Sequence, residues 1–86
     1  MPATVDPLSQ QLIDLLMKAG YEAEGELIEE IVQDGEWAVA QCIAIGYINR
    51  LNIPISRNLV VDVLDVAEQE DDAEAIEDCH FLERTL

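Results

Sequence analysis

The chain has 86 residues, half of them apolar, with 19 acidic and 4 basic residues and a formal net charge of −15 at pH 7. This length fits one domain, and the apolar fraction is too high for a disordered chain. The charge argues against direct binding to nucleic acid or to an anionic membrane surface, because the field of the chain repels phosphate.

The first six residues, Met1 to Asp6, contain neither the basic segment nor the apolar segment of a signal peptide. The most apolar stretch, residues 37–48, is shorter than the roughly 20 residues of a membrane span. We therefore expect a cytoplasmic protein that does not enter a membrane. In a reducing compartment Cys42 and Cys79 are expected to be free thiols, with a disulfide as the alternative.

Residues 7–19 are predicted to form the first helix. Asp6 is a suitable N-cap, and Pro7 is tolerated at the first helical position because its missing N–H has no partner there in any case. Gly20 supplies the stop. A second helix is predicted over residues 23–33, with apolar side chains on one side and carboxylates on the other.

A third helix, predicted over residues 36–51, is apolar on nearly every side. From Trp37 to Val61 the chain contains no acidic residue. Such a helix is buried, either at the centre of the fold or in a protein interface. The small residues Ala40, Ala44 and Gly46 would let neighbouring helices approach it closely.

Two more helices are predicted after an extended connector at Ile53-Pro54-Ile55. Ser56 is the candidate N-cap of a helix that ends near residue 69. The β-branched residues of this segment favour a strand, but the i, i+1, i+4, i+5, i+8 spacing of its apolar residues favours a helix, and we give the period more weight. Asp71, with Glu74 three residues later, resembles a capping box and predicts a last helix over residues 73–83. We expect this helix to turn four side chains inward: Ala73, Ile76, Cys79 and His80.

These elements predict an all-α fold, a compact bundle of four to five short helices around a central apolar helix at about residues 36–51. The bundle would form a single small acidic domain over residues 1–86.

The sequence offers little for catalysis or metal binding. The single histidine, His80, follows Cys79, but adjacent helical positions do not face each other. Ser9 and Ser56, the two serines, both lie at predicted helix starts. Zinc needs four Cys or His ligands, or three with a water, and two of the three such residues here are neighbours in the sequence. The carboxylates of residues 68–74 lack the turn glycine of a calcium loop. We therefore expect no enzyme activity, no cofactor and no metal site.

The excess of carboxylates is the most unusual feature of the sequence. Residues 22–36 hold seven carboxylates and residues 62–83 hold ten, and neither segment contains Lys or Arg. Solubility needs a net charge of only about 2–8 in a small domain, and like charges three or four residues apart on a helix cost about 0.2–0.5 kcal/mol per pair. Two interpretations weigh equally: the carboxylates only solvate outer helix faces, or they bind a basic partner.

Our first hypothesis is a non-enzymatic interaction protein that docks its acidic faces on a basic surface of another protein. Where that surface normally binds nucleic acid, the chain would inhibit it as a nucleic-acid mimic. The candidate contacts are the carboxylates of Glu22, Glu26, Glu29, Glu30, Asp62, Asp65, Asp71, Asp72 and Glu74.

The second hypothesis is a homo-oligomeric or scaffolding helical subunit, in the simplest case a homodimer. The central helix has more apolar surface than a core of this size needs, so part of it would form an interface. The candidate interface residues are Trp37, Tyr47, Ile53 and Ile55, with Ile45 beside them. The two hypotheses are not exclusive.

Overall fold

The computed structural model describes residues 5–86, and this part of the chain is all-α, without a strand. The five helices are α1 (Pro7–Lys18), α2 (Glu22–Gln33), α3 (Trp37–Arg50), α4 (Arg57–Gln69) and α5 (Ala73–Thr85). Each predicted helix is present, with ends that differ by one or two residues from the expected ones. The expectation that the chain starts without a signal peptide concerns mainly residues 1–4, which lie outside the described residues. No helix in residues 5–86 is long and apolar enough to cross a membrane.

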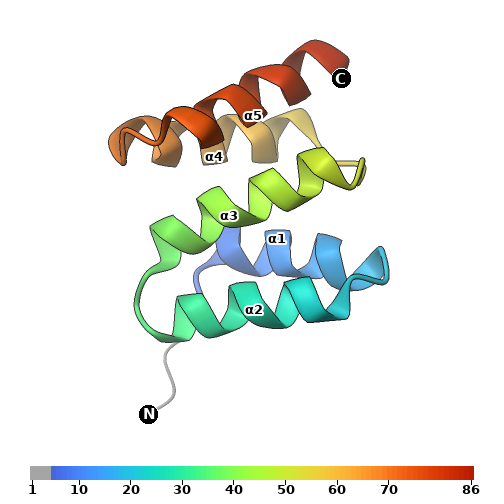
Figure 1. Ribbon diagram of the computed structural model, residues 1–86, viewed down its shortest axis with the longest axis vertical. Helices are drawn as coiled ribbons and strands as arrows, with labels where there is room; N and C mark the ends of the chain where they lie inside the picture. Colours follow the sequence, from blue (N-terminus) through green and yellow to red (C-terminus); the bar gives the residue numbers. More distant parts are fainter. Residues whose placement is uncertain (1–4) are drawn as a thin grey trace.

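The helices form two layers, and each one reverses the direction of the one before it (Figure 1). The nearer layer holds α2, α3 and α5 side by side, and α1 and α4 lie behind it. Helix α3 packs against all four other helices, whereas α2 contacts only α1 and α3, and α5 contacts only α3 and α4. The prediction of a central apolar helix is therefore confirmed.

The core lies around α3. Ala40, Ala44, Ile45 and Ile48 are fully buried there, so the small residues of this helix allow the close packing expected of them. Two polar side chains, Gln41 and Ser9, are also buried. Gln41 Nε2 donates to Asp6 Oδ2 at 2.9 Å and to Ser9 Oγ at 3.0 Å. This amide ties the start of α1 to α3.

Helix starts follow the predicted caps with one exception. Asp6 accepts the Ser9 backbone N–H at 3.0 Å, and Ser56 caps α4 in the same way. The cap of α5 is Asp72, which accepts the Ala75 N–H at 3.1 Å, and not Asp71 as expected. Asp71 has instead the left-handed backbone conformation (φ 54°) that terminates α4. The capping box predicted with Glu74 is therefore wrong by one residue.

The side of α5 that faces the core also differs from the expected one. Ala75, Cys79 and Leu82 are buried and Ile76 is half-buried, whereas Ala73 and His80 are exposed. Positions 75, 79 and 82 recur at helical spacing, so they share one side of the helix. His80 lies about 100° away from Cys79 around the helix and faces solvent.

Candidate functional site

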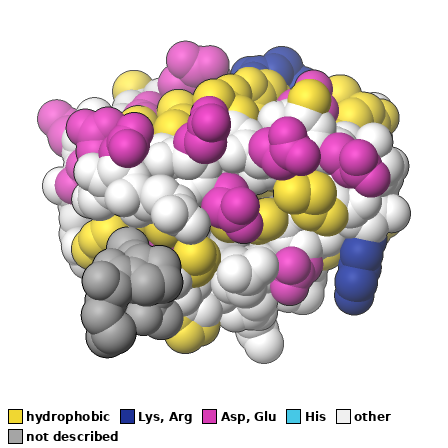
Figure 2. Space-filling view, turned by 90° about the horizontal axis from the view of Figure 1, so that it is seen from below, with side chains coloured by type: hydrophobic (Ala, Val, Ile, Leu, Met, Phe, Trp, Pro, Cys, Tyr) yellow, Lys and Arg dark blue, Asp and Glu magenta, His cyan; other side chains and the backbone are white. Residues whose placement is uncertain are grey.

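The first candidate site is the α2 acidic surface, formed by Glu22, Glu26, Glu29 and Glu30. Their spacing places them within about 100° of arc on α2. All four are exposed, and the buried residues of α2 lie on its opposite side. Figure 2 looks onto the end of the molecule formed by α1 and α2, where Asp and Glu side chains are spread across the surface and Lys and Arg are sparse.

The carboxylates of the α2 acidic surface have no partner within residues 5–86. None of them accepts a hydrogen bond there, and none belongs to an ion pair. The ion pair in this part of the chain joins Arg50 Nη1 to Glu74 Oε1 at 4.0 Å, and both side chains are largely exposed. The charge of α2 therefore remains available to a partner.

The second candidate site is the α4–α5 acidic surface, formed by Asp62, Asp65, Asp71, Asp72 and Glu74. Asp62 and Asp65 lie on the exposed side of α4, and Asp71 and Glu74 are also exposed. Asp72 differs from the other four because it is half-buried and caps α5. Its carboxylate serves the fold, so it is a poorer candidate for partner contact than sequence reasoning suggested.

The structure does not bring the nine predicted contacts together. Helix α2 lies at one end of the longest axis of the molecule, and α4 and α5 lie at the other (Figure 1). The molecule extends 40 Å along this axis. The two acidic surfaces are thus separate and do not form one continuous site.

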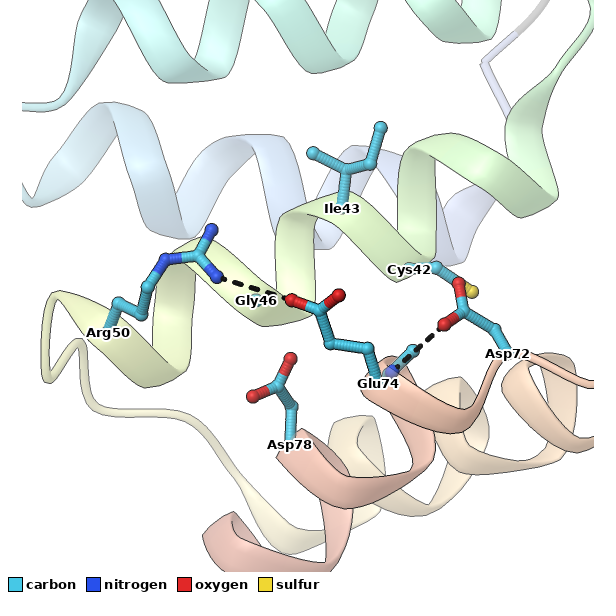
Figure 3. A pocket seen from close by; sticks show the side chains of 8 residues that line it. Cys42, Ile43, Gly46, Arg50, Asp72, Glu74 and Asp78 are labelled. Atoms are coloured by element: carbon cyan, nitrogen blue, oxygen red, sulfur yellow. Dashed lines mark hydrogen bonds and ion pairs between the residues drawn. The ribbon is translucent and has the colours of Figure 1, made fainter.

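A groove along the seam between α3 and α5 was not predicted; we name it the α3–α5 groove. Its first hollow has a volume of about 140 Å³ and lies between Gly46 on α3 and Ala75 on α5 (Figure 3). Asp72, Glu74 and Asp78 line this hollow together with Arg50. The sequence could have indicated one part of this groove: a helical wheel centred on Ala75, Cys79 and Leu82 places Asp78 beside a neighbouring helix. That this neighbour is α3 depends on the tertiary structure and could not be predicted.

Contacts across the groove fix its charged side chains. Asn49 Nδ2 donates to Asp78 Oδ1 at 2.8 Å. The Arg50 guanidinium lies 5.5 Å from the centre of the Tyr47 ring and turns back along α3 toward Glu74 (Figure 3). A Cβ atom on Gly46 would lie 3.4 Å from Arg50 Nη1 and from Asp78 Oδ2, so both side chains lie directly over this glycine.

The thiols do not provide a nucleophile. Burial, followed by the nearby Asp72 carboxylate, raises the pKa of the Cys42 thiol to about 11. Burial, followed by the charge of Asp78, raises the pKa of Cys79 to about 12. Both cysteines are free and buried, as predicted, and both thiols are protonated at neutral pH. His80 is exposed while Cys79 is buried, so these neighbours do not form a Cys–His pair. Within the described residues no cluster of His, Cys, Asp and Glu could hold a metal ion.

Most of the predicted interface residues are used inside the chain. Ile45, Ile53 and Ile55 are buried in the core, so they do not face a second molecule. The connector that carries Ile53 and Ile55 packs inward because both side chains join the core cluster. Trp37 is 51% exposed, and Tyr47 is half-buried beside Arg50.

Comparisons with protein-family models, with curated proteins and with solved structures found no match for this chain. The observations on function therefore come from the surfaces of the chain itself.

Proposed function

We propose that this protein is a non-enzymatic interaction protein whose α2 acidic surface binds a basic surface of a partner protein. One observation carries the proposal: four adjacent exposed carboxylates of α2 have no cation beside them in the described part of the chain. Helices usually place Lys among their Glu residues, because opposite charges at i, i+4 stabilise a helix and like charges destabilise it. The repulsion along α2 is a cost that binding to a cationic surface would offset.

The charge density of α2 supports a more specific form of this proposal. Glu22 and Glu30 are separated by about 12 Å of helix axis, so the four charges lie on average about 4 Å apart along it. A single DNA strand carries one charge per about 3.4 Å. The protein would then inhibit a nucleic-acid-binding partner by occupying its basic surface. It would not bind nucleic acid itself, because its own charge repels phosphate.

Affinity capture with matched variants tests the proposal. The test variant is E22Q/E26Q/E29Q/E30Q, and the control D14N/E36Q/E68Q/E70Q removes the same charge from exposed positions outside the candidate contacts. Each immobilised protein is incubated with a lysate of its source cells and washed at low and at high salt. We expect the original protein and the control to retain a basic protein that high salt releases, since screening weakens exposed charge pairs.

A competition measurement completes this test. The retained protein is mixed with labelled DNA or RNA, and the original chain should displace the nucleic acid while the α2 variant should not. Equal retention by the α2 variant, or retention that high salt does not reduce, would contradict the proposal.

Exposed apolar side chains favour a second candidate function, a homo-oligomeric subunit. Leu27, Trp37 and Val39 are each at least 40% exposed on α2 and at the start of α3. Light scattering coupled to size exclusion at micromolar concentration tests it. A dimer that Trp37→Ala converts to a monomer would support this function, and a monomer of the original chain would exclude an obligate oligomer.

The cytoplasmic location stays a prediction.

A further inference from the structure

The α3–α5 groove continues beyond its first hollow along the whole seam. The second hollow shares Glu74 and Asp78 with the first, and the third shares Asn49 and Phe81 with the second. The third hollow ends between Pro54 of the connector and Leu86 at the end of the chain. The lining residues run along α5 from Asp72 to Leu86, about 21 Å, which is the length of a partner helix of three to four turns.

The two ends of the groove differ in chemistry. Asp72, Glu74 and Asp78 line the first hollow, and the second adds Glu77. At the other end Phe81 is 48% exposed and Leu86 is 51% exposed, next to Pro54. Two basic side chains lie at this end: Arg84 lies over the Phe81 ring at 6.0 Å, and Arg57 Nη2 donates to the Leu86 carbonyl at 3.4 Å. The groove is therefore acidic at one end, and at the other it is apolar with positive charge at its side.

The carboxylates at the acidic end can accept a new cation. Asp78 uses Oδ1 to accept from Asn49, and its Oδ2 faces the space above Gly46. The Glu74 side chain is 83% exposed and its pair with Arg50 is 4.0 Å long. An exposed pair of this length contributes little, so a partner's Lys or Arg can displace Arg50.

We propose that the α3–α5 groove binds an amphipathic helix of a partner protein, with Lys or Arg at one end and large apolar side chains about two turns away. The cations would contact Glu74 and Asp78, and the apolar side chains would cover Phe81, Pro54 and Leu86. Seven residues separate Glu74 from Phe81 on α5, about 10 Å, which matches two turns of such a helix. This surface lies at the other end of the molecule from α2, so the inference goes beyond the proposed function and does not need it.

Charge segregation distinguishes this partner from a uniformly basic one. Lysines at both ends would bring one end close to Arg84, whereas apolar residues there would bury exposed surface. A helix with segregated charge is therefore expected to bind more tightly than a more cationic helix with lysines throughout. If the net charge of the chain alone attracted the peptide, the more cationic helix would instead bind more tightly.

Fluorescence anisotropy with synthetic helix-forming peptides tests the inference on the full chain. The first peptide has about 14 residues, with Lys at one end and Leu on one side of the other end. The second has Lys at both ends and between them, and the third replaces each Lys of the first with Glu. The protein variants are E74Q/D78N at the acidic end and F81A at the apolar end. The control for E74Q/D78N is D14N/E36Q, which removes the same charge from exposed positions outside the candidate contacts. Asn at position 78 keeps an oxygen to accept from Asn49, and Phe81 is half exposed, so the fold is expected to tolerate both changes.

We expect the first peptide to bind most tightly. Each groove variant should weaken its binding about tenfold, whereas D14N/E36Q should change the affinity less than twofold. E74Q/D78N should also remove most of the salt dependence, and F81A should leave it. Equal weakening by D14N/E36Q and E74Q/D78N would overturn the groove proposal, because binding would then follow the net charge of the chain, and it would leave the α2 proposal in place. Tighter binding of the uniformly basic peptide, or no binding of the first, would also overturn it. The capture experiment decides the proposed function separately.

Discussion

Glu26 lies at the centre of the like charges of α2, and its replacement should stabilise the protein. Glu22 precedes it by four residues, and Glu29 and Glu30 follow it by three and four, so Glu26 takes part in three repulsive pairs. Each pair costs about 0.2–0.5 kcal/mol, so Glu26→Gln should raise the free energy of unfolding by about 0.6–1.5 kcal/mol at low salt. Glu26→Lys turns the same pairs into attractions and should raise it by roughly twice as much.

Thermal unfolding followed by circular dichroism measures this effect. For a domain of this size 1 kcal/mol corresponds to about 4–8 °C in Tm, so Glu26→Gln should raise Tm by roughly 2–12 °C. The rise should shrink at high salt, because exposed charges are screened. Glu22→Gln is the control: it removes one repulsive pair but also a carboxylate from the first turn of α2, where the helix dipole favours negative charge. Its effect on Tm should be close to zero or negative.

Two results would refute this reasoning. One is no rise in Tm for Glu26→Gln at low salt, which would show that the carboxylates of α2 do not repel each other appreciably. The other is a rise that persists at high salt, which would show a cause other than charge. If the α2 acidic surface binds a basic partner, the same variants should weaken that binding, so stability and affinity should change in opposite directions.

Two further predictions concern the α4–α5 loop and the thiols. Asp72→Ala should lower the free energy of unfolding by about 1 kcal/mol in urea denaturation, because the Ala75 N–H loses its acceptor. Asp71→Gly should be neutral or stabilising, because glycine adopts a positive φ freely. Equal losses of stability in the two variants would contradict the assignment of Asp72 as the cap. The raised pKa values of Cys42 (about 11) and Cys79 (about 12) mean that the folded protein holds protons that the unfolded chain releases above pH 9. These thiols should therefore not affect the free energy of unfolding below about pH 9, and each should lower it by about 1 kcal/mol by about pH 10. Cys42→Ala should remove about half of this fall. Urea unfolding curves, measured with reductant, that give the same free energy at about pH 8 and pH 10 would contradict this prediction.

The helices were predictable because their ends carry local signals. Asp6 with Pro7 and Ser56 mark helix starts, and Gly20 adopts the positive φ expected after the end of α1. Asp71 misled the prediction because Asp caps a helix start as readily as it takes the left-handed conformation at a helix end. Only the neighbouring hydrogen bonds decide between these two roles.

The exposure of the carboxylates was also predictable, but their arrangement in space was not. Periodicity places Glu26 and Asp62 on the polar sides of their helices. It does not say on which side of α3 each helix packs, and the order of α2, α3 and α5 in one layer is what separates the two acidic surfaces. The α3–α5 groove depends in addition on the register that brings Asn49 to Asp78, and neither residue belongs to a pattern that specifies its partner.

The protein keeps its charge apart from the contacts that stabilise its fold. Helix α3 carries no acidic residue and contacts every other helix, while nearly all candidate acidic contacts are exposed. The one ion pair in the described part of the chain is exposed and contributes little, so burial of apolar side chains around α3, and not charge pairing, offsets the repulsion. Most of the carboxylates can consequently be replaced without loss of a stabilising contact. The exceptions include Asp6, Asp72 and Asp78, which accept hydrogen bonds that hold the fold together. A carboxylate whose removal raises stability and abolishes binding would be one that the protein retains for its partner, and Glu26 is the residue at which both effects can be measured in a single variant.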